Sequence, residues 1–405
     1  MGGLSGQDHG NAEEPVALPL PLVYNVRSVR ARWPVALLAV VGIALVVAVF
    51  AVLMAMSQGF RAALRATGRP DNAIVVSRGS NSEISSLVEL EHRNAILDHV
   101  PVVRGPDGRP LASWERVSVM ALPRKSDGRR TNVVLRAVTP QAFLVRTGIH
   151  LTAGRRFTPG LDEVMVGRRI MDSVRGLELG GVLRYRRQQL RIVGVFESEG
   201  AAFESEIWGD FETTLRSRRG PGSSSLVVRV EDPAQIAALD RWIRLQPNMP
   251  LRAVSERQYY QDQAGPVAKT IKALGGLVAV VMGIGAVFAA MNTMYRIVAS
   301  RTREIGTLRA VGFSRRAILS SFVVESALLG IAGGALGCLV ASTLHGYSTS
   351  TSNLQSFSEV AFAFRITPTI VASSMGFALA MGVLGGLLPA ARAARLPIAA
   401  AVREG

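Results

Sequence analysis

Residues 299–337 read ASRTREIGTLRAVGFSRRAILSSFVVESALLGIAGGALG and join a short charged run to a long apolar one. In the charged run, Ile305, Leu308 and Gly312 recur on roughly one side of an expected helix. Gly312 is suited to end that helix, and Ser314 is suited to cap the next one. The pattern predicts a short amphipathic helix that leads directly into a membrane span, although an ordinary basic loop would show a similar composition.

The chain contains several apolar runs that reach the length of about 20 residues needed to cross a bilayer. The predicted spans are residues 34–56, 272–296, 318–344 and 367–389. A cleaved signal peptide is the alternative for the first run, but this run is longer than a signal core and begins far from residue 1. We therefore expect a membrane α-helical protein with four transmembrane helices.

The segment between the first and second spans, residues 57–270, is mixed, charged and interrupted by turns. Helical character continues beyond the first span and returns before the second. Further helices are expected at residues 83–99, 168–175 and 233–244. Short strands are expected at residues 73–77, 117–121, 133–138, 163–166, 183–186, 190–195 and 226–230. The segment is thus predicted to be an α+β domain that is large enough for its own core.

Composition excludes several classes of function. The net charge of +16 is carried almost wholly by Arg, and no compact basic block interleaved with aromatic residues is present, so nucleic-acid binding is not expected. The single cysteine, Cys338, excludes an internal disulfide. The five histidines form no metal-ligand pattern with one another or with the cysteine, and no nucleophile lies in a motif with a base. We expect no metal site and no catalytic residue.

Charge also predicts the orientation of the spans. Arg is concentrated in the loop 297–317 and flanks the first and last spans, whereas residues 345–364 contain neither Lys nor Arg. The positive-inside rule then places both termini and the 297–317 loop in the cytoplasm. The domain 57–270 and the loop 345–365 are expected on the extracytoplasmic side. The remaining segments are predicted as a flexible tail at 1–21, an amphipathic interfacial helix at 22–33 and a cytoplasmic tail at 390–405.

The charged run and the residues around the last span carry a family resemblance. The matching residues of the short helix are Thr302, Arg303, Glu304, Ile305, Gly306, Leu308, Arg309, Ala310, Val311 and Gly312, and Gly386-Leu387-Leu388-Pro389-Ala390 ends the last span. They resemble the ABC transporter permeases of the MacB, FtsX and LolC/LolE family, also called type VII or mechanotransmission transporters. The resemblance implies a multi-pass protein of the bacterial inner membrane. It also implies that the short helix couples the permease to an ATPase by docking in a cleft of it.

Two further features of the spans belong to the same pattern. Glu325 is expected about two turns inside the third span, where it either contacts another helix, with Arg296 as the expected partner, or acts in a proton or substrate relay. Glycines at four-residue spacing allow helices to approach closely. These expected packing residues are Gly330, Gly333, Gly334, Gly337, Gly382 and Gly386.

The chain has no Gly-Lys phosphate-binding loop, so it carries no cofactor of its own in this interpretation. ATP and Mg are expected on a separate ABC ATP-binding subunit, present in two copies. The resemblance further implies a homodimer, or a heterodimer with a paralogous permease, and leaves a periplasmic adaptor open.

The layout of the chain is most similar to that of a MacB-like permease without a fused ATPase, in which roughly residues 111–220 form an insert subdomain. Export of a substrate handled on the outer side is expected. Lipoprotein release and FtsX-like regulation of an extracytoplasmic enzyme are the alternatives.

Overall fold

Helices and strands divide the chain into two units, which we name by their content. The computed structural model describes residues 33–215, 222–353 and 358–396. The helical unit consists of residues 33–54, 274–344 and 366–396, and the sheet unit of residues 55–273 and 345–365. The predicted tail 1–21, nearly all of the predicted interfacial helix 22–33 and residues 397–405 lie outside the described residues.

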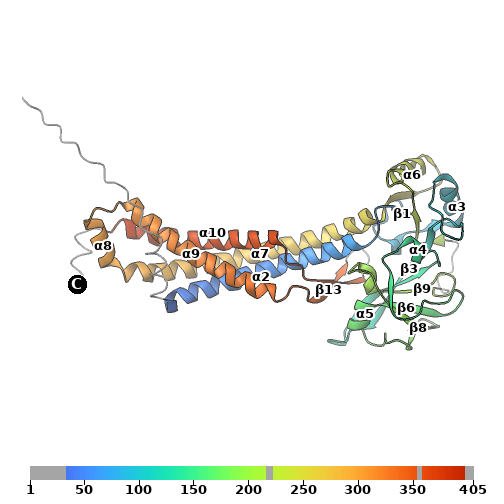
Figure 1. Ribbon diagram of the computed structural model, residues 1–405, viewed down its shortest axis with the longest axis horizontal. Helices are drawn as coiled ribbons and strands as arrows, with labels where there is room; N and C mark the ends of the chain where they lie inside the picture. Colours follow the sequence, from blue (N-terminus) through green and yellow to red (C-terminus); the bar gives the residue numbers. More distant parts are fainter. Residues whose placement is uncertain (1–32, 216–221, 354–357, 397–405) are drawn as a thin grey trace, which may run out of the picture. The chain divides into compact units, whose positions relative to one another are not determined.

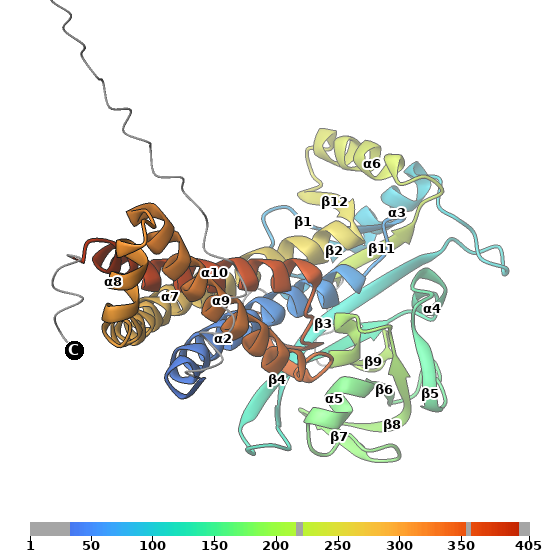
Figure 2. The same ribbon diagram turned by 60° about the vertical axis from the view of Figure 1, so that its left-hand side comes forward.

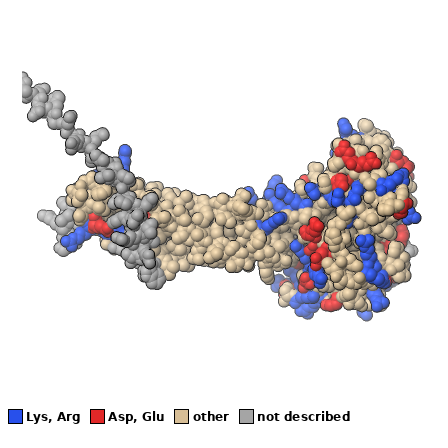
Figure 3. Space-filling view, in the orientation of Figure 1, with Lys and Arg blue, Asp and Glu red and all other residues tan. Residues whose placement is uncertain are grey.

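Four long helices account for most of the helical unit (Figure 1). They are α2 (Trp33–Ala66), α7 (Glu256–Ala299), α9 (Arg315–Ser342) and α10 (Pro368–Ala394). All four are long and apolar enough to cross a membrane, which confirms the predicted fold class. On the face shown in Figure 3, the middle of the helical unit has no charged side chain, as contact with lipid requires. Helices α2 and α7 also contribute residues to the sheet unit.

The short helix α8 (Thr302–Ala310) lies between α7 and α9 at one end of the bundle (Figures 1 and 2). Gly312 follows it with a φ of 109°, a left-handed conformation that favours glycine. Ser314 then caps α9, because its side-chain oxygen accepts a hydrogen bond from the backbone N–H of Ala317. Both local predictions for the boundary between the two helices are confirmed.

The sheet unit is built on one mixed sheet with the strand order β12-β1-β11-β3-β4-β9-β6-β8-β5, to which β7 is added beside β8. At one edge, β1 lies between β11 and β12, and α6 (Ala234–Leu245) connects these two strands. This arrangement is a split βαβ unit. The strands are β1 (Asn72–Ser77), β3 (Ala112–Pro123), β4 (Arg130–Val138), β5 (His150–Gly154), β6 (Glu163–Gly167), β7 (Val182–Tyr185), β8 (Gln188–Glu197), β9 (Glu206–Asp210), β11 (Ser225–Arg229) and β12 (Leu251–Ser255).

The sequence pattern predicted seven strands of the main sheet and missed three others. All of the expected strands are present, whereas β5, β9 and β12 were not predicted. Each of these strands contains a single β-branched residue, and β9 reads EIWGD, which is polar at both ends. Its pairing with β4 and β6 is long-range, and such pairing leaves no signal in a short window of sequence.

The predicted helix at 83–99 is wrong in its first part. The segment forms a 3-10 turn, η1 (Glu83–Ser85), then β2 (Val88–Glu89), which pairs with β10 (Gly222–Ser223), and only then α3 (Leu90–His99). Serine hydroxyls bond to the backbone here, as when Ser86 accepts from the N–H of Ser77. Such local bonds compete with helix formation.

The predicted loop 345–365 contains a β-hairpin. Strands β13 (Ser348–Asn353) and β14 (Ser358–Ala363) pair antiparallel, and the whole segment belongs to the sheet unit. The polar sequence STSTSN of β13 gave no strand pattern, so the sequence predicted only a connection. The hairpin is covalently continuous with α9 and α10, which lie before and after it in the chain.

Candidate functional site

Helix α8 packs one side into the helical unit. Ile305 is 2% exposed, and Gly306 is also buried. Ile305 contacts a cluster that includes Met294 of α7, Ile318 of α9 and Ala390 of α10. Because all four long helices contribute to this cluster, α8 is packed against the end of the bundle.

The opposite side of α8 is exposed. Its side chains are Arg303, Glu304, Thr307 and Ala310, followed by Val311 directly after the helix. Val311 is 74% exposed. We name these five residues the α8 face.

A buried ion pair connects the start of α8 to the third span. Arg301 precedes the helix, and its Nη1 lies 2.9 Å from Oε2 of Glu325 in α9. Arg301 is 7% exposed and Glu325 is 2% exposed. The expected contact of Glu325 with Arg296 is therefore corrected. Arg296 lies in the last turn of α7 and is exposed, whereas the chain folds back at residue 301 toward α9.

The other predicted residues of the short helix divide into two groups. Arg309 donates from Nη1 to the carbonyl of Phe313 (2.9 Å), so it closes the turn between α8 and α9. Leu308 is half-buried beside the cluster that holds Ile305. Thr302 donates to the carbonyl of Ala299. These side chains, with Ile305 and Gly306, form the packed side of the helix and its ends, while the side chains of the α8 face are exposed.

The predicted glycines of α9 pack against two different helices. A Cβ at Gly330 would lie 2.7 Å from the carbonyl oxygen of Ala378 in α10, and one at Gly334 would lie 2.7 Å from the Ala378 Cβ. A Cβ at Gly333 would instead lie 2.8 Å from Ile43 in α2, and one at Gly337 2.6 Å from the carbonyl oxygen of Ala44. Helix α9 is thus held closely between α2 and α10.

Two glycines of α10 complete this contact. A Cβ at Gly382 would lie 2.6 Å from the carbonyl oxygen of Ser326, and one at Gly386 would lie 2.0 Å from the Ser326 hydroxyl. A third closely packed glycine of α10, Gly385, was not predicted from the sequence; a Cβ at Gly385 would lie 2.7 Å from the Cβ of Ala290 in α7. Gly385 is adjacent to Gly386 and lacked the four-residue spacing that marks the others.

Among the described residues, one group could hold a metal ion. Glu89, Glu91 and His92 place one ligand atom each within 4.8 Å of one another. The two carboxylates are exposed, and exposed acidic groups are common on protein surfaces without an ion. We assign no metal to them.

Two family models match the chain over most of its length. The MacB-like periplasmic core domain matches residues 36–245, and the FtsX-like permease C-terminal domain matches residues 276–398. The first match begins in α2 and covers most of the sheet unit, and the second covers α8, α9 and α10.

Curated relatives agree with these matches. The chain is 26% identical over 326 residues to the macrolide export ATP-binding/permease protein MacB of Neisseria gonorrhoeae, covering 74% of this chain and 49% of that protein. It is 29% identical over 293 residues to MacB 2 of Yersinia pestis, covering 66% of this chain and 41% of that protein. The chain therefore spans about half the length of the curated relatives that it matches.

Solved structures with similarity include the periplasmic region of MacB from Actinobacillus actinomycetemcomitans. It has a TM-score of 0.36 and 15% identity, covering 49% of this chain and 94% of that one. The extracellular domain of the ABC-type transporter YknZ from Gram-positive bacteria has a TM-score of 0.34 and 17% identity, covering 45% of this chain and 99% of that one. Since its family models together cover both units, the chain belongs to the ABC transporter permeases that carry a MacB-like periplasmic core domain and an FtsX-like permease C-terminal domain.

Proposed function

We propose that this permease is driven by an ATP-binding partner that docks on the α8 face. The α8 face carries this proposal, because it exposes polar side chains and Val311 on a helix whose other side is packed into the spans. A helix seated in this way cannot move alone. A push on it is passed to α9 through the buried Arg301–Glu325 pair and the turn closed by Arg309.

The proposal includes the topology and the partners expected from the sequence. The α8 end of the bundle faces the cytoplasm of a bacterial inner membrane, with both chain termini, and the sheet unit lies outside. Two ATP-binding subunits act on two permeases, either identical or paralogous. Motion passes along α2 and α7, which continue into the sheet unit, and the substrate is exported from the outer side. Whether an adaptor takes part depends on the partner of the sheet unit.

The test substitutes the α8 face and leaves the buried side intact. Thr307→Trp and Val311→Asp change exposed side chains, so the permease should fold and insert normally. We expect both variants to lose the ATP-binding subunit that co-purifies with the tagged wild-type permease. Arg316→Ala, an exposed change outside α8, is the matched control and should keep the partner.

Gly306 and Arg309 are poor sites for such a test, because their substitution would disturb packing and the α8–α9 turn directly. If Thr307→Trp and Val311→Asp retain the ATP-binding subunit as well as the control does, docking on the α8 face is wrong. An ATP-binding subunit that is absent even from the wild-type preparation would contradict the wider proposal.

A further inference from the structure

Three segments of the sheet unit continue into the spans. Two are the helix segments 55–66 of α2 and 256–273 of α7. The third is the β13–β14 hairpin, which follows α9 and precedes α10. Since α9 begins directly after α8, the hairpin is the first part of the sheet unit that the chain reaches beyond the proposed docking helix.

Glu359 of β14 fixes this hairpin to the sheet. Its side chain is 2% exposed, and Oε2 lies 3.1 Å from Nη2 of Arg124, which directly follows β3. The same carboxylate oxygen accepts a hydrogen bond from Thr131 of β4, and the other oxygen accepts one from Ser350 of β13. One carboxylate therefore ties both strands of the hairpin to the β3–β4 strands.

The remainder of β14 is also held. Ser205 accepts a hydrogen bond from the N–H of Ala361 (2.9 Å), and Arg169 donates to the Ala361 carbonyl (3.1 Å). Phe362 is fully buried and meets Phe60 of α2 edge to face, with ring centroids 5.7 Å apart. These contacts fix the position of the hairpin on the sheet unit.

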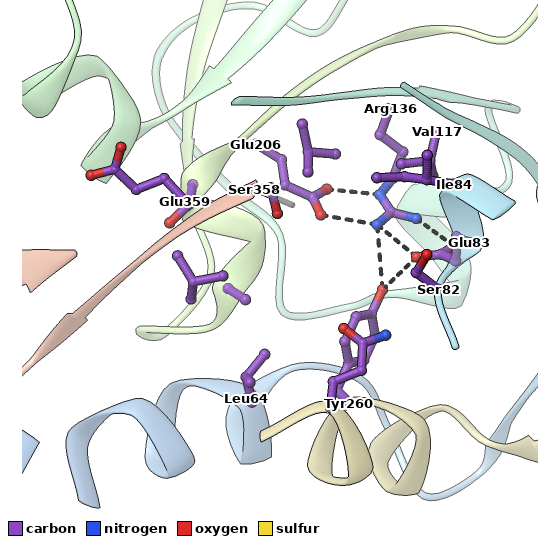
Figure 4. A pocket seen from close by; sticks show the side chains of 15 residues that line it. Leu64, Ser82, Glu83, Ile84, Val117, Arg136, Glu206, Tyr260, Ser358 and Glu359 are labelled. Carbon is purple, nitrogen blue, oxygen red and sulfur yellow. Dashed lines mark hydrogen bonds and ion pairs between the residues drawn. The ribbon is translucent and has the colours of Figure 1, made fainter. Parts of the chain in front are cut away.

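The contacts of the three segments converge at one small cavity of about 40 Å³ (Figure 4). Leu64 of α2 and Tyr260 of α7 line one side, and Ser358 and Glu359 of β14 line another. Across the cavity, Arg136 of β4 is only 2% exposed and forms ion pairs with three carboxylates. These are Glu83, Glu115 and Glu206, at 2.7 to 2.8 Å. Fully paired buried networks of this kind are rigid, so a displacement of any segment is passed to the sheet.

We propose that Glu359 is a positioning residue that clamps the β13–β14 hairpin to β3 and β4 and so adds a second route of transmission. Movement of α9 and α10 reaches β3 and β4 through the hairpin, separately from movement that α2 and α7 deliver. The proposal rests on the proposed function, because it assigns the clamp a role in coupling to ATP.

The clamp itself is tested without any partner. In a Cys338→Ala background, spin labels are placed at Tyr347→Cys beside the hairpin and Asp127→Cys in the β3–β4 turn, both exposed positions. We expect one narrow distance distribution in the wild type. Glu359→Gln should broaden it, and so should Arg124→Gln, which removes the same ion pair from a side chain that is 34% exposed. Arg129→Gln, in the same turn but 86% exposed, is the control. Unchanged distributions for both variants would overturn the clamp.

Coupling is tested with the ATP-binding partner in nanodiscs. Labels at Asp127 and at Leu245, the exposed end of α6, report movement of the β3–β4 strands relative to the β11–α6–β12 edge. We expect ATP to change this distance in the wild type and in Arg129→Gln. Glu359→Gln and Arg124→Gln should show a smaller change than Arg129→Gln, because only the route through α2 and α7 remains, while the partner still binds and hydrolyses ATP.

The outcomes distinguish the two proposals. If the partner binds but Glu359→Gln keeps the full ATP-dependent distance change, or the wild type shows none, the second route is wrong and the proposed function stands. If no ATP-binding partner binds the wild type, the proposed function fails and the coupling role of Glu359 fails with it. The spin-label distribution in the isolated permease decides the clamp in either case.

Discussion

At the scale of single residues, the Arg301–Glu325 pair of the helical unit is expected to tolerate substitution poorly. Both groups are buried, and removing one partner leaves a buried charge without its counterpart. We expect Glu325→Leu or Arg301→Met to lower the free energy of unfolding by about 3–5 kcal/mol. The double variant should be closer to the wild type, because an apolar pair carries no desolvated charge.

Denaturation of the detergent-solubilised permease measures these changes. Glu304→Gln is the control, since the Glu304 side chain is 44% exposed and lies 3.6 Å from Arg301. Because the Glu304 carboxylate is partly exposed, we expect its pair with Arg301 to contribute only about 0–1 kcal/mol. Single variants of the buried pair that match this control would show that the pair is dispensable for stability.

The low pKa of Glu163 predicts that the stability of the sheet unit depends on pH. The hydrogen bond from Arg155 lowers the pKa of Glu163 to about 2, and Thr158 donates to the same carboxylate. Because the folded pKa lies below the unfolded value of about 4.3, the stabilisation is complete above that value and is lost as pH falls toward 2. The stability difference between wild type and Glu163→Gln should shrink over this range.

Urea unfolding, followed by tryptophan fluorescence, tests this expectation. Trp114, Trp208 and Trp242 all lie in the sheet unit, so the signal reports mainly on it. Glu178→Gln, at an exposed position, provides the matched control. A difference for Glu163→Gln that stays constant from neutral pH to pH values near 2 would contradict the assignment.

At the scale of elements, the contact between α9 and α10 depends on glycine. A Cβ at Gly382 would lie 2.6 Å from a backbone oxygen of α9, which cannot move without moving the helix. Gly376 in the same helix has no atom within 4 Å of its Cβ position. We expect Gly382→Ala to lower the thermal midpoint and Gly376→Ala to keep or raise it, because Ala favours a helix by about 1 kcal/mol over Gly. Equal midpoints for the two variants would mean that α9 and α10 have room to separate.

At the scale of the whole molecule, Arg136 is the residue around which the buried ion-pair network of the sheet unit is built. Burial alone lowers the pKa of Arg136, but Glu206 and Glu83 raise it well above its ordinary value, so it stays charged. Burial alone raises the pKa of Glu83, but the nearby charge of Arg136 has the larger effect and holds the pKa of Glu83 below its ordinary value. The paired charges join η1, β3, β4 and β9, and Tyr260 adds the beginning of α7.

Arg136→Met should therefore destabilise the sheet unit strongly. It leaves three carboxylates without this partner, so we expect a loss of at least about 3–5 kcal/mol in unfolding free energy. Trp208 donates to Glu206 and is fully buried, so its fluorescence reports the change directly. Arg129→Met, at a side chain that is 86% exposed, should stay near the wild type. If both variants unfold at the same urea concentration, the network is not the centre of stability.

The sequence by itself determined the spans, the α+β class of the domain between the first two and the boundary between α8 and α9. Each of these is set by neighbours in the chain: a continuous apolar run, a β-branched run, a glycine that tolerates positive φ, or a capping serine. The glycine spacing in α9 also gave local information, because residues four apart share one face of a helix.

Only the tertiary structure decided the partner of Glu325, the network around Arg136 and the attachment of the hairpin. Glu325 pairs with a residue 24 positions away, and Glu359 bonds to one 228 positions away. Such pairs have no period in the sequence. The partner of a buried charge depends on which elements pack together, and that packing is fixed by the sheet order and the helix contacts of the folded chain.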